Sequence, residues 1–128
     1  MFKLVCLLFL LLSFPASAIN IEDKLAQVNY FSLGYNGFVA KKSEGELLYE
    51  KLLPEKNSEE VFFKLLQSDQ STNESKLYAA CGLWLLNKDR LEEIRPEKGF
   101  VTVLQGDILR REDYVEYFSR IKKRGCVR

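Results

Sequence analysis

The most informative absence in this chain of 128 residues is histidine, which does not occur at all. Histidine is the commonest general base near neutral pH and the commonest transition-metal ligand in proteins. Without it, the Ser–His and Cys–His pairs that activate most hydrolase nucleophiles cannot form. The sequence also has no glycine-rich phosphate-binding loop and no metal-ligand cluster. We therefore expect a protein that is not an enzyme and uses no cofactor or metal.

Charge of one sign is lacking as well, since 19 basic residues face 18 acidic ones and the net charge is +1. A balanced chain creates no strong long-range field, which argues against a dedicated nucleic-acid-binding function. Basic residues concentrate only in the tail over 120–128. Most of this tail fits the favourable placement of cations at a helix C-terminus. The remaining prediction is a weak contact with an anionic membrane surface.

The first 18 residues have the three zones of a cleavable export signal. Lys3 supplies the positive zone, residues 4–12 form an uncharged apolar run, and Ala16-Ser17-Ala18 has small residues where signal peptidase requires them. A membrane-spanning helix needs about 20 apolar residues, and this run is shorter. We predict cleavage at the end of the small-residue pattern. The mature protein is then a single small domain over 19–128, which is periplasmic or secreted.

Cysteine is scarce, and one of the three, Cys6, lies inside the predicted signal. In an oxidising compartment the remaining pair, Cys81 and Cys126, is a candidate disulfide. Such a bridge would close a loop of about 45 residues and stabilise the fold by about 4 kcal/mol on a chain-entropy estimate. The alternative is that Cys81 is a small buried apolar residue and Cys126 a free thiol on a frayed tail. The sequence leaves both alternatives open.

Two amphipathic helices are predicted after residue 42. Ser43 to Glu46 form a capping box, in which Ser43 accepts from the amide of Glu46 and the Glu46 side chain returns the bond. The helix that follows should end at Pro54. Ser58 is predicted to cap a second helix, whose apolar residues fall on one stripe: Val61, Phe62, Leu65 and Leu66.

The remaining elements complete the predicted architecture. Residues 77–86 are apolar around nearly the whole circumference of a helix, so this helix should be central and buried and should pair with the preceding one as an αα-hairpin. A short helix over 88–94, a strand over 100–104 and a final helix over 111–123 should follow, with Gly125 as the stop. The predicted class is mainly α (α+β): a small helical domain with a central αα-hairpin and a short β element.

The segment from 30 to 40 is rich in aromatic residues and contains two glycines, which is typical of a strand or tight turn. The preceding residues, 19–28, are predicted to be extended or to form one helical turn. Two interpretations of the aromatic residues remain open. They either fill the core or form the wall of a ligand groove, and the residues concerned are Tyr30, Phe31, Tyr35 and Phe38.

The string Lys76-Leu77-Tyr78-Ala79-Ala80-Cys81-Gly82-Leu83, together with Leu33-Gly34-Tyr35 through Ser43-Glu44-Gly45, resembles a family of small exported bacterial proteins. Some members are named after a gene of unassigned role in a microcin production cluster. The similarity spans roughly 30–110 and implies a location in the bacterial envelope but no established activity. The family pattern typically has a second cysteine after a glycine near the strand. Here Gly106 is followed by Asp107, and a Gly-Cys pair occurs only at Gly125-Cys126.

From these observations we expect an exported, non-enzymatic accessory or interaction protein whose partner is a protein or peptide. The alternative is a binding module for a small apolar or peptide ligand, held by the aromatic wall. A role in protection against a microcin or a related toxin follows only from the family resemblance.

Overall fold

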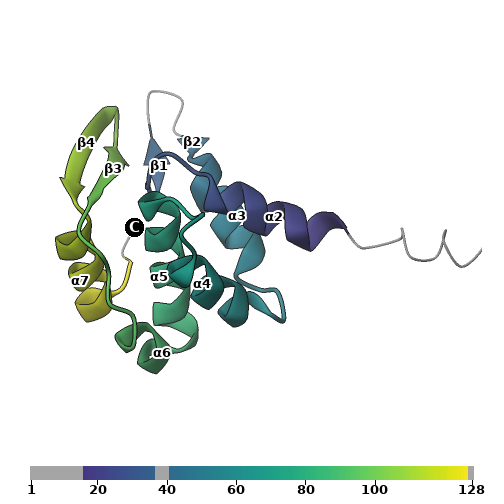
Figure 1. Cartoon of the computed structure of the whole chain (residues 1–128). Coiled ribbons are helices and arrows are strands. Elements are labelled where there is room, and N and C mark those ends of the chain that lie inside the picture. Colours follow the sequence, from purple (N-terminus) through teal and green to yellow (C-terminus); the bar gives the residue numbers. More distant parts are fainter. Residues whose placement is uncertain (1–15, 37–40, 127–128) are drawn as a thin grey trace, which may run out of the picture.

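The computed structural model describes residues 16–36 and 41–126. This part of the chain forms six helices and two small antiparallel sheets, arranged as in Figure 1. This confirms the predicted mainly helical α+β class. In chain order the elements are α2 (Ala16–Ala26), β1 (Tyr35–Asn36), β2 (Lys41–Lys42), α3 (Glu44–Leu52), α4 (Ser58–Gln67), α5 (Asn73–Leu86), α6 (Lys88–Glu92), β3 (Phe100–Gln105), β4 (Ile108–Asp113) and α7 (Tyr114–Arg124). None of the described helices is long and apolar enough to cross a bilayer.

Helix α5 is the centre of the molecule, as the sequence predicts. Every residue from Leu77 to Leu83 is buried, and α5 packs against α3, α4 and α7. A side chain in place of Gly82 would collide with the ring of Phe62, so this glycine lets α4 approach closely and form the predicted αα-hairpin. The prediction was wrong for the last turn, where Leu85 and Leu86 are 58% and 43% exposed.

The segment after the predicted cleavage position is more regular than expected. Helix α2 runs through to Ala26, so the prediction of an extended stretch or a single turn was wrong. Leu25 is fully buried and Ile21, one helical turn earlier, is half-buried against the same core. This four-residue spacing of apolar side chains stabilises the helix by tertiary packing. The helix begins at Ala16, two residues before the predicted cleavage position.

Two predicted helix starts differ in detail. Ser43 caps α3 and accepts from the Glu46 amide at 3.1 Å, as expected, but the Glu46 side chain accepts from the backbone N–H of Gly34 at 2.9 Å. A long-range partner has replaced the local one. Ser58 is the first helical residue of α4 and not its cap. Asn57 holds the cap position without a side-chain hydrogen bond.

The C-terminal β element is a full hairpin. Strands β3 and β4 pair over six residue pairs, from Phe100 with Asp113 to Gln105 with Ile108. The prediction of helix from residue 111 was therefore wrong, because Arg111 to Asp113 continue the ladder. Asp113 caps α7 by accepting from the Glu116 amide at 2.9 Å. Tyr114, Phe118 and Ile121 of α7 face inward, and Gly125 ends the helix at a φ of +73°, at the predicted position.

Phe31 adds a third row to this sheet. It forms a parallel bridge to Val103, its N–H donates to the carbonyl of Thr102 at 2.8 Å, and its carbonyl accepts from Leu104 at 2.9 Å. Strand β3 therefore lies between Phe31 and β4, and β4 is the open edge. In Figure 1, β4 is on the side of the hairpin away from β1 and β2.

Candidate functional site

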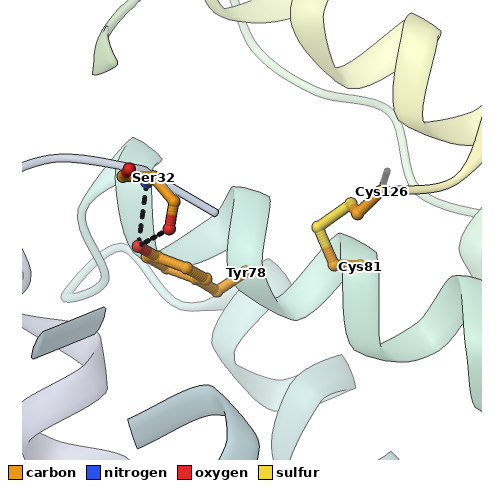
Figure 2. Close-up of a disulfide and its surroundings, with 4 residues drawn as sticks. All are labelled: Ser32, Tyr78, Cys81 and Cys126. Atoms are coloured by element: carbon orange, nitrogen blue, oxygen red, sulfur yellow. Dashed lines mark hydrogen bonds between the residues drawn. A yellow bond between two sulfur atoms is a disulfide. The ribbon is translucent and has the colours of Figure 1, made fainter. Parts of the chain in front are cut away.

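The two cysteines outside the predicted signal lie together. Cys81 and Cys126 are joined as a disulfide with their Cα atoms 5.5 Å apart, across 45 positions of sequence (Figure 2). This fits the bridge alternative of the sequence analysis. Cys81 is fully buried in α5, whereas Cys126 follows α7 and is half-buried. The bridge ties the end of α7 to the central helix. Gly106-Asp107, where the family pattern would place its cysteine, forms the turn of the β3–β4 hairpin.

Gly125 makes the approach to this bridge feasible. Its φ of +73° is in the region that side chains rarely adopt, and an added Cβ would lie 2.6 Å from the ring of Trp84. The chain therefore turns directly over Trp84 on its way to Cys126. The sequence analysis identified Gly125 as a helix stop but not as a packing contact, because the position of Trp84 depends on the tertiary structure.

A half-open groove of about 420 Å³ lies beside the disulfide, between the β3–β4 hairpin, the segment around Phe31 and α7. Its apolar walls come from the hairpin, from α7 and from residues 31–33. Its polar rim includes two arginines one helical turn apart. The lining residues are Phe31, Ser32, Leu33, Val103, Leu104, Gln105, Glu112, Tyr117, Arg120, Ile121, Arg124, Gly125 and Cys126. Its exposed lining is more polar than apolar, so a ligand that joins an apolar part to a polar or charged group suits it better than a purely apolar one.

The centre of the groove is built around Tyr117. Its ring meets that of Phe31 edge-on, with centroids 5.5 Å apart, and the guanidinium of Arg120 lies 4.6 Å from its centroid. Arg120 also donates to Glu112 of β4 at 2.9 Å. Burial raises the pKa of the Tyr117 hydroxyl, and the nearby Glu112 carboxylate raises it further. Tyr117 is therefore a neutral hydrogen-bonding group at physiological pH.

Arg124 differs from Arg120 in its neighbours. It is exposed at the rim of the groove and forms no ion pair with any described residue. A guanidinium has five N–H donors in a fixed planar fork that suits carboxylates and phosphates. The groove thus combines the half-buried Tyr117 ring, backed by the buried Phe31, with a cation at its edge that pairs with no described residue.

Two members of the predicted aromatic wall, Tyr30 and Phe31, line different grooves. Phe31 is 3% exposed, touches Tyr78 as well as Tyr117, and lines the groove beside the disulfide. Tyr30 is half-buried and lines a different groove, of about 420 Å³, next to α2 and the start of α3. Successive residues of an extended segment point to opposite sides, which separates these two rings. The side chain of Tyr35 and the whole of Phe38 lie outside the described residues.

Beneath Phe31, a buried hydroxyl network holds the extended segment in place. The Ser32 N–H donates to the Tyr78 hydroxyl, which in turn donates to the Ser32 carbonyl, both at 2.9 Å (Figure 2). Ser43 donates to the same carbonyl at 3.1 Å, and its oxygen lies 3.0 Å from that of Tyr78. Burial raises the pKa of Tyr78 to about 12. A phenol this hard to ionise supports structure and is poorly suited to act as a base.

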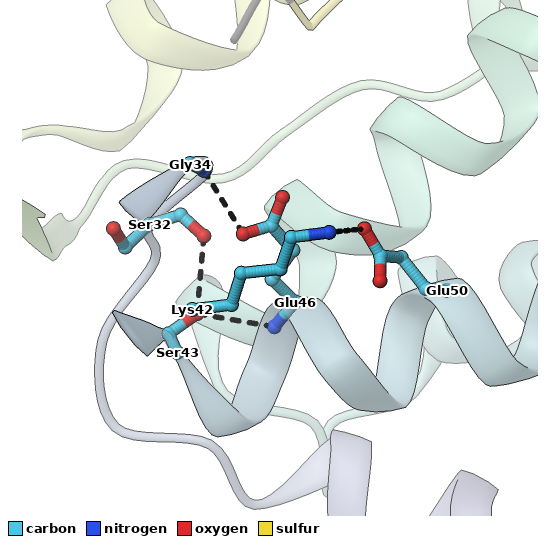
Figure 3. Close-up of polar contacts among 6 residues, drawn as sticks. All are labelled: Ser32, Gly34, Lys42, Ser43, Glu46 and Glu50. Atoms are coloured by element: carbon cyan, nitrogen blue, oxygen red, sulfur yellow. Dashed lines mark hydrogen bonds and ion pairs between the residues drawn. The ribbon is translucent and has the colours of Figure 1, made fainter. Parts of the chain in front are cut away.

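The neighbouring carboxylates extend this network to the surface. Figure 3 shows Glu46 reaching Gly34, and Lys42 paired with Glu50 at 2.7 Å. Glu46 is fully buried although it sits in the first turn of α3. Together these contacts bind the segment around Ser32 to α3 and α5. They fix the position of Phe31, and through it one wall of the groove beside the disulfide.

Sequence reasoning missed the groove residues Glu112, Tyr117 and Arg120. The predicted helix from 111 placed Glu112 and Arg120 eight positions apart on one helix, a spacing at which the two side chains do not meet. The β4–α7 junction folds them together. In the part of the chain that the structure describes, no three potential ligand side chains converge on a metal-sized site.

Comparison with known proteins gives no relative from which a function could be transferred. No family model matches the chain, and neither a curated protein nor a solved structure is significantly similar to it.

Proposed function

We propose that this protein is an exported, non-enzymatic accessory protein that binds a peptide or a small apolar anion in the groove beside the Cys81–Cys126 bridge. The observation that carries the proposal is the groove itself, where the half-buried Tyr117 ring, backed by the buried Phe31, lies near Arg124, which forms no ion pair with any described residue. An apolar ligand with a carboxylate, such as the end of a peptide chain, has both matching features.

Three further observations support an exported binding protein. The N-terminal pattern is that of a secretory signal. A disulfide that ties a terminus to the core is typical of small domains in oxidising compartments. The groove walls come from β3, α7 and the anchored segment at 31–33, and a preformed site of this kind loses little entropy on binding.

The membrane contact predicted for the basic tail is less well supported. Lys122 donates to the carbonyl of Ile94 at 2.7 Å, and Arg120 is paired with Glu112. These two cations are therefore partly committed to contacts within the protein. We retain membrane attachment only as a secondary prediction.

The groove is tested by NMR with two matched probes, N-acetyl-leucine and its uncharged amide. We expect the carboxylate to shift the amide signals of Phe31, Tyr117 and Arg124, and to bind several-fold more tightly than the amide. Arg124→Gln should remove this preference for the charged probe. Lys123→Gln should preserve this preference. It removes the same charge from an adjacent exposed residue that does not line the groove.

Two results would contradict the proposal. Signal changes scattered over the surface, or centred on the groove at Tyr30, would show that the groove beside the disulfide is not the binding site. Turnover of any ester, peptide or glycoside substrate by the purified protein, in a broad hydrolase screen, would show that the protein is an enzyme.

A further inference from the structure

The open edge of the hairpin is a second surface, separate from the groove. All residues of β4 except Glu112 are exposed, and the large apolar side chains at both ends of the hairpin stand in solvent: Phe100 is 60%, Ile108 57% and Leu109 62% exposed. Six residues of exposed strand with apolar side chains form a template for pairing with another strand.

The hydrogen-bond pattern shows which backbone groups of β4 are available. Thr102 and Leu104 of β3 bond to Phe31 on one side. Because backbone groups alternate along a strand, the bonds to β4 come from Val101, Val103 and Gln105. Their register partners are Glu112, Arg110 and Ile108. The backbone groups of the alternate β4 residues, Leu109 and Arg111, therefore point outward, and no described residue pairs with them.

The charges along β4 are self-complementary. The strand reads Ile-Leu-Arg-Arg-Glu-Asp from 108 to 113, so its basic residues precede its acidic ones. A second copy running antiparallel presents acidic residues to these arginines. Arg110 and Arg111 form no ion pair with any described residue, and Arg111 stacks 5.1 Å from the ring centroid of Phe100.

We propose that two copies of this chain pair antiparallel through β4, around a two-fold axis at Arg111. Backbone hydrogen bonds between the two β4 strands form only at residues whose N–H and C=O groups point outward. This restricts the two-fold axis to a few positions along the strand. With the axis at Arg111, the two Arg111 residues exchange backbone hydrogen bonds. Arg110 then faces Glu112 of the partner subunit, twice by symmetry. Arg111 lies opposite Arg111 of the partner subunit. Asp113 of the partner subunit is the diagonal cross-strand neighbour of Arg111, and the long arginine side chain can reach it.

The two neighbouring registers are less favourable. An axis at Glu112 would place Arg111 opposite Asp113 of the partner subunit but Glu112 opposite its own copy, and it would pair only residues 111–113 of each strand, because β4 ends at Asp113. An axis at Arg110 would place this arginine directly opposite itself and Ile108 opposite a glutamate, which loses both ion pairs. Pairing through β4 joins Phe31, β3 and β4 of each subunit into one continuous six-row sheet. Because the contact is a single strand pair, we expect a weak, concentration-dependent dimer and not an obligate one.

Sedimentation velocity over about 1 μM to about 1 mM protein tests the pairing. We expect a monomer–dimer equilibrium that Arg111→Pro weakens by about tenfold or more, because proline removes an outward N–H without breaking a bond to β3. Leu85→Glu changes an equally exposed residue at the end of α5, away from the hairpin, and should leave the equilibrium unchanged. Circular dichroism should verify that both variants are folded.

A charge-exchange experiment avoids dependence on the proline variant. Arg110→Glu and Glu112→Arg should each be monomeric, because each places like charges opposite one another. Mixing these two variants should restore a one-to-one heterodimer, in which both cross-strand pairs are again of opposite charge. A wild-type protein that stays monomeric at all concentrations would overturn the proposal. So would a dimer that survives Arg111→Pro, or single variants that still dimerise alone.

This proposal shares Glu112 with the groove, where Glu112 is part of the lining and pairs with Arg120, so the two proposals are separated by the variants at other positions. Arg110 and Arg111 do not line the groove, and Arg124 is not on β4. Loss of the probe preference at Arg124 and loss of the dimer at Arg111 are therefore separate results.

Discussion

The helical part of the molecule and its C-terminal hairpin have opposite distributions of apolar residues. In α5, seven successive residues from Leu77 to Leu83 are buried and carry no charge. In β4, the apolar residues Ile108 and Leu109 are exposed beside two arginines. Burial of apolar side chains supplies most of the stability of a small domain. We conclude that α5 maintains the fold, while the C-terminal hairpin with α7 presents the surfaces available for contact.

The disulfide is a covalent connection between these two regions, which also pack against each other, and breaking it should have the largest effect. Cys126→Ser should lower the free energy of unfolding by about 4 kcal/mol, because it releases a 45-residue loop from the unfolded chain. Denaturant unfolding of the variant and of the reduced wild type, each compared with the oxidised wild type, measures this loss. We expect the two to agree. Mass spectrometry without reductant should give a mass two hydrogens below that of the reduced protein, and two free thiols would refute the bridge.

A pair of leucines compares the two regions directly. Leu77→Ala should destabilise the fold by about 3 kcal/mol, because the truncated side chain leaves a cavity at a fully buried position of α5. Leu109→Ala removes the same atoms from a residue that is 62% exposed, and should change stability by about 0.5 kcal/mol or less. Urea denaturation of both variants provides the test, at a protein concentration low enough to keep the chain monomeric. Equal losses would contradict the division into core and contact surface.

Alkaline pH provides a smaller effect that is specific to the core. Burial raises the pKa of Tyr78 from 10.0 to about 12, and burial also raises that of Tyr114. In the unfolded chain a tyrosine ionises near pH 10, whereas in the folded protein these tyrosines are still neutral at that pH. The free energy of unfolding that they contribute is therefore fully present below pH 10 and is lost as the pH rises toward 12. For Tyr78 this loss is about 2–3 kcal/mol.

The Tyr78→Phe variant separates this contribution from the rest. It should be less stable than the wild type at pH 7, by about 1–3 kcal/mol, because Ser32 and Ser43 lose their buried partner. Its free energy of unfolding should also fall less steeply above pH 10 than that of the wild type. Tyr114→Phe is the matched control, since no described residue hydrogen-bonds to the Tyr114 hydroxyl. If both variants lost the same stability at pH 7, the network around Tyr78 would not have the role assigned to it.

The sequence predicts the helical region well because its signals are local. The apolar run at 77–86, the stripe of α4 and the cap at Ser43 all depend on neighbours within one or two turns. The structure has the stripe and the cap, and it has the buried run as far as Leu83. The hairpin is predicted only in part. Residues 111–113 suit the start of a helix, but pairing with Phe100 to Thr102 across the turn at Gly106 holds them in β4.

The groove could not be predicted because its parts are distant in sequence. Phe31 and Tyr117 are 86 positions apart, and their contact depends on the bridge of Phe31 to Val103 and on the docking of α7. The local aromatic cluster at 30–38 indicated a wall made of sequence neighbours. The extended backbone directs Tyr30 and Phe31 to different grooves instead. Glu46 shows the same effect on a smaller scale, because its partner Gly34 is twelve positions away and not in its own helix.

The most direct test of the central claim is the affinity of the groove for N-acetyl-leucine in Arg124→Gln compared with Lys123→Gln. Both variants lose one positive charge, from adjacent residues at the end of α7, but only Arg124 lines the groove. We predict that Arg124→Gln binds the carboxylate probe no better than its amide, whereas Lys123→Gln binds as the wild type does. Equal affinities in the two variants would contradict the account, because binding would then depend on the overall charge of the tail and not on the groove.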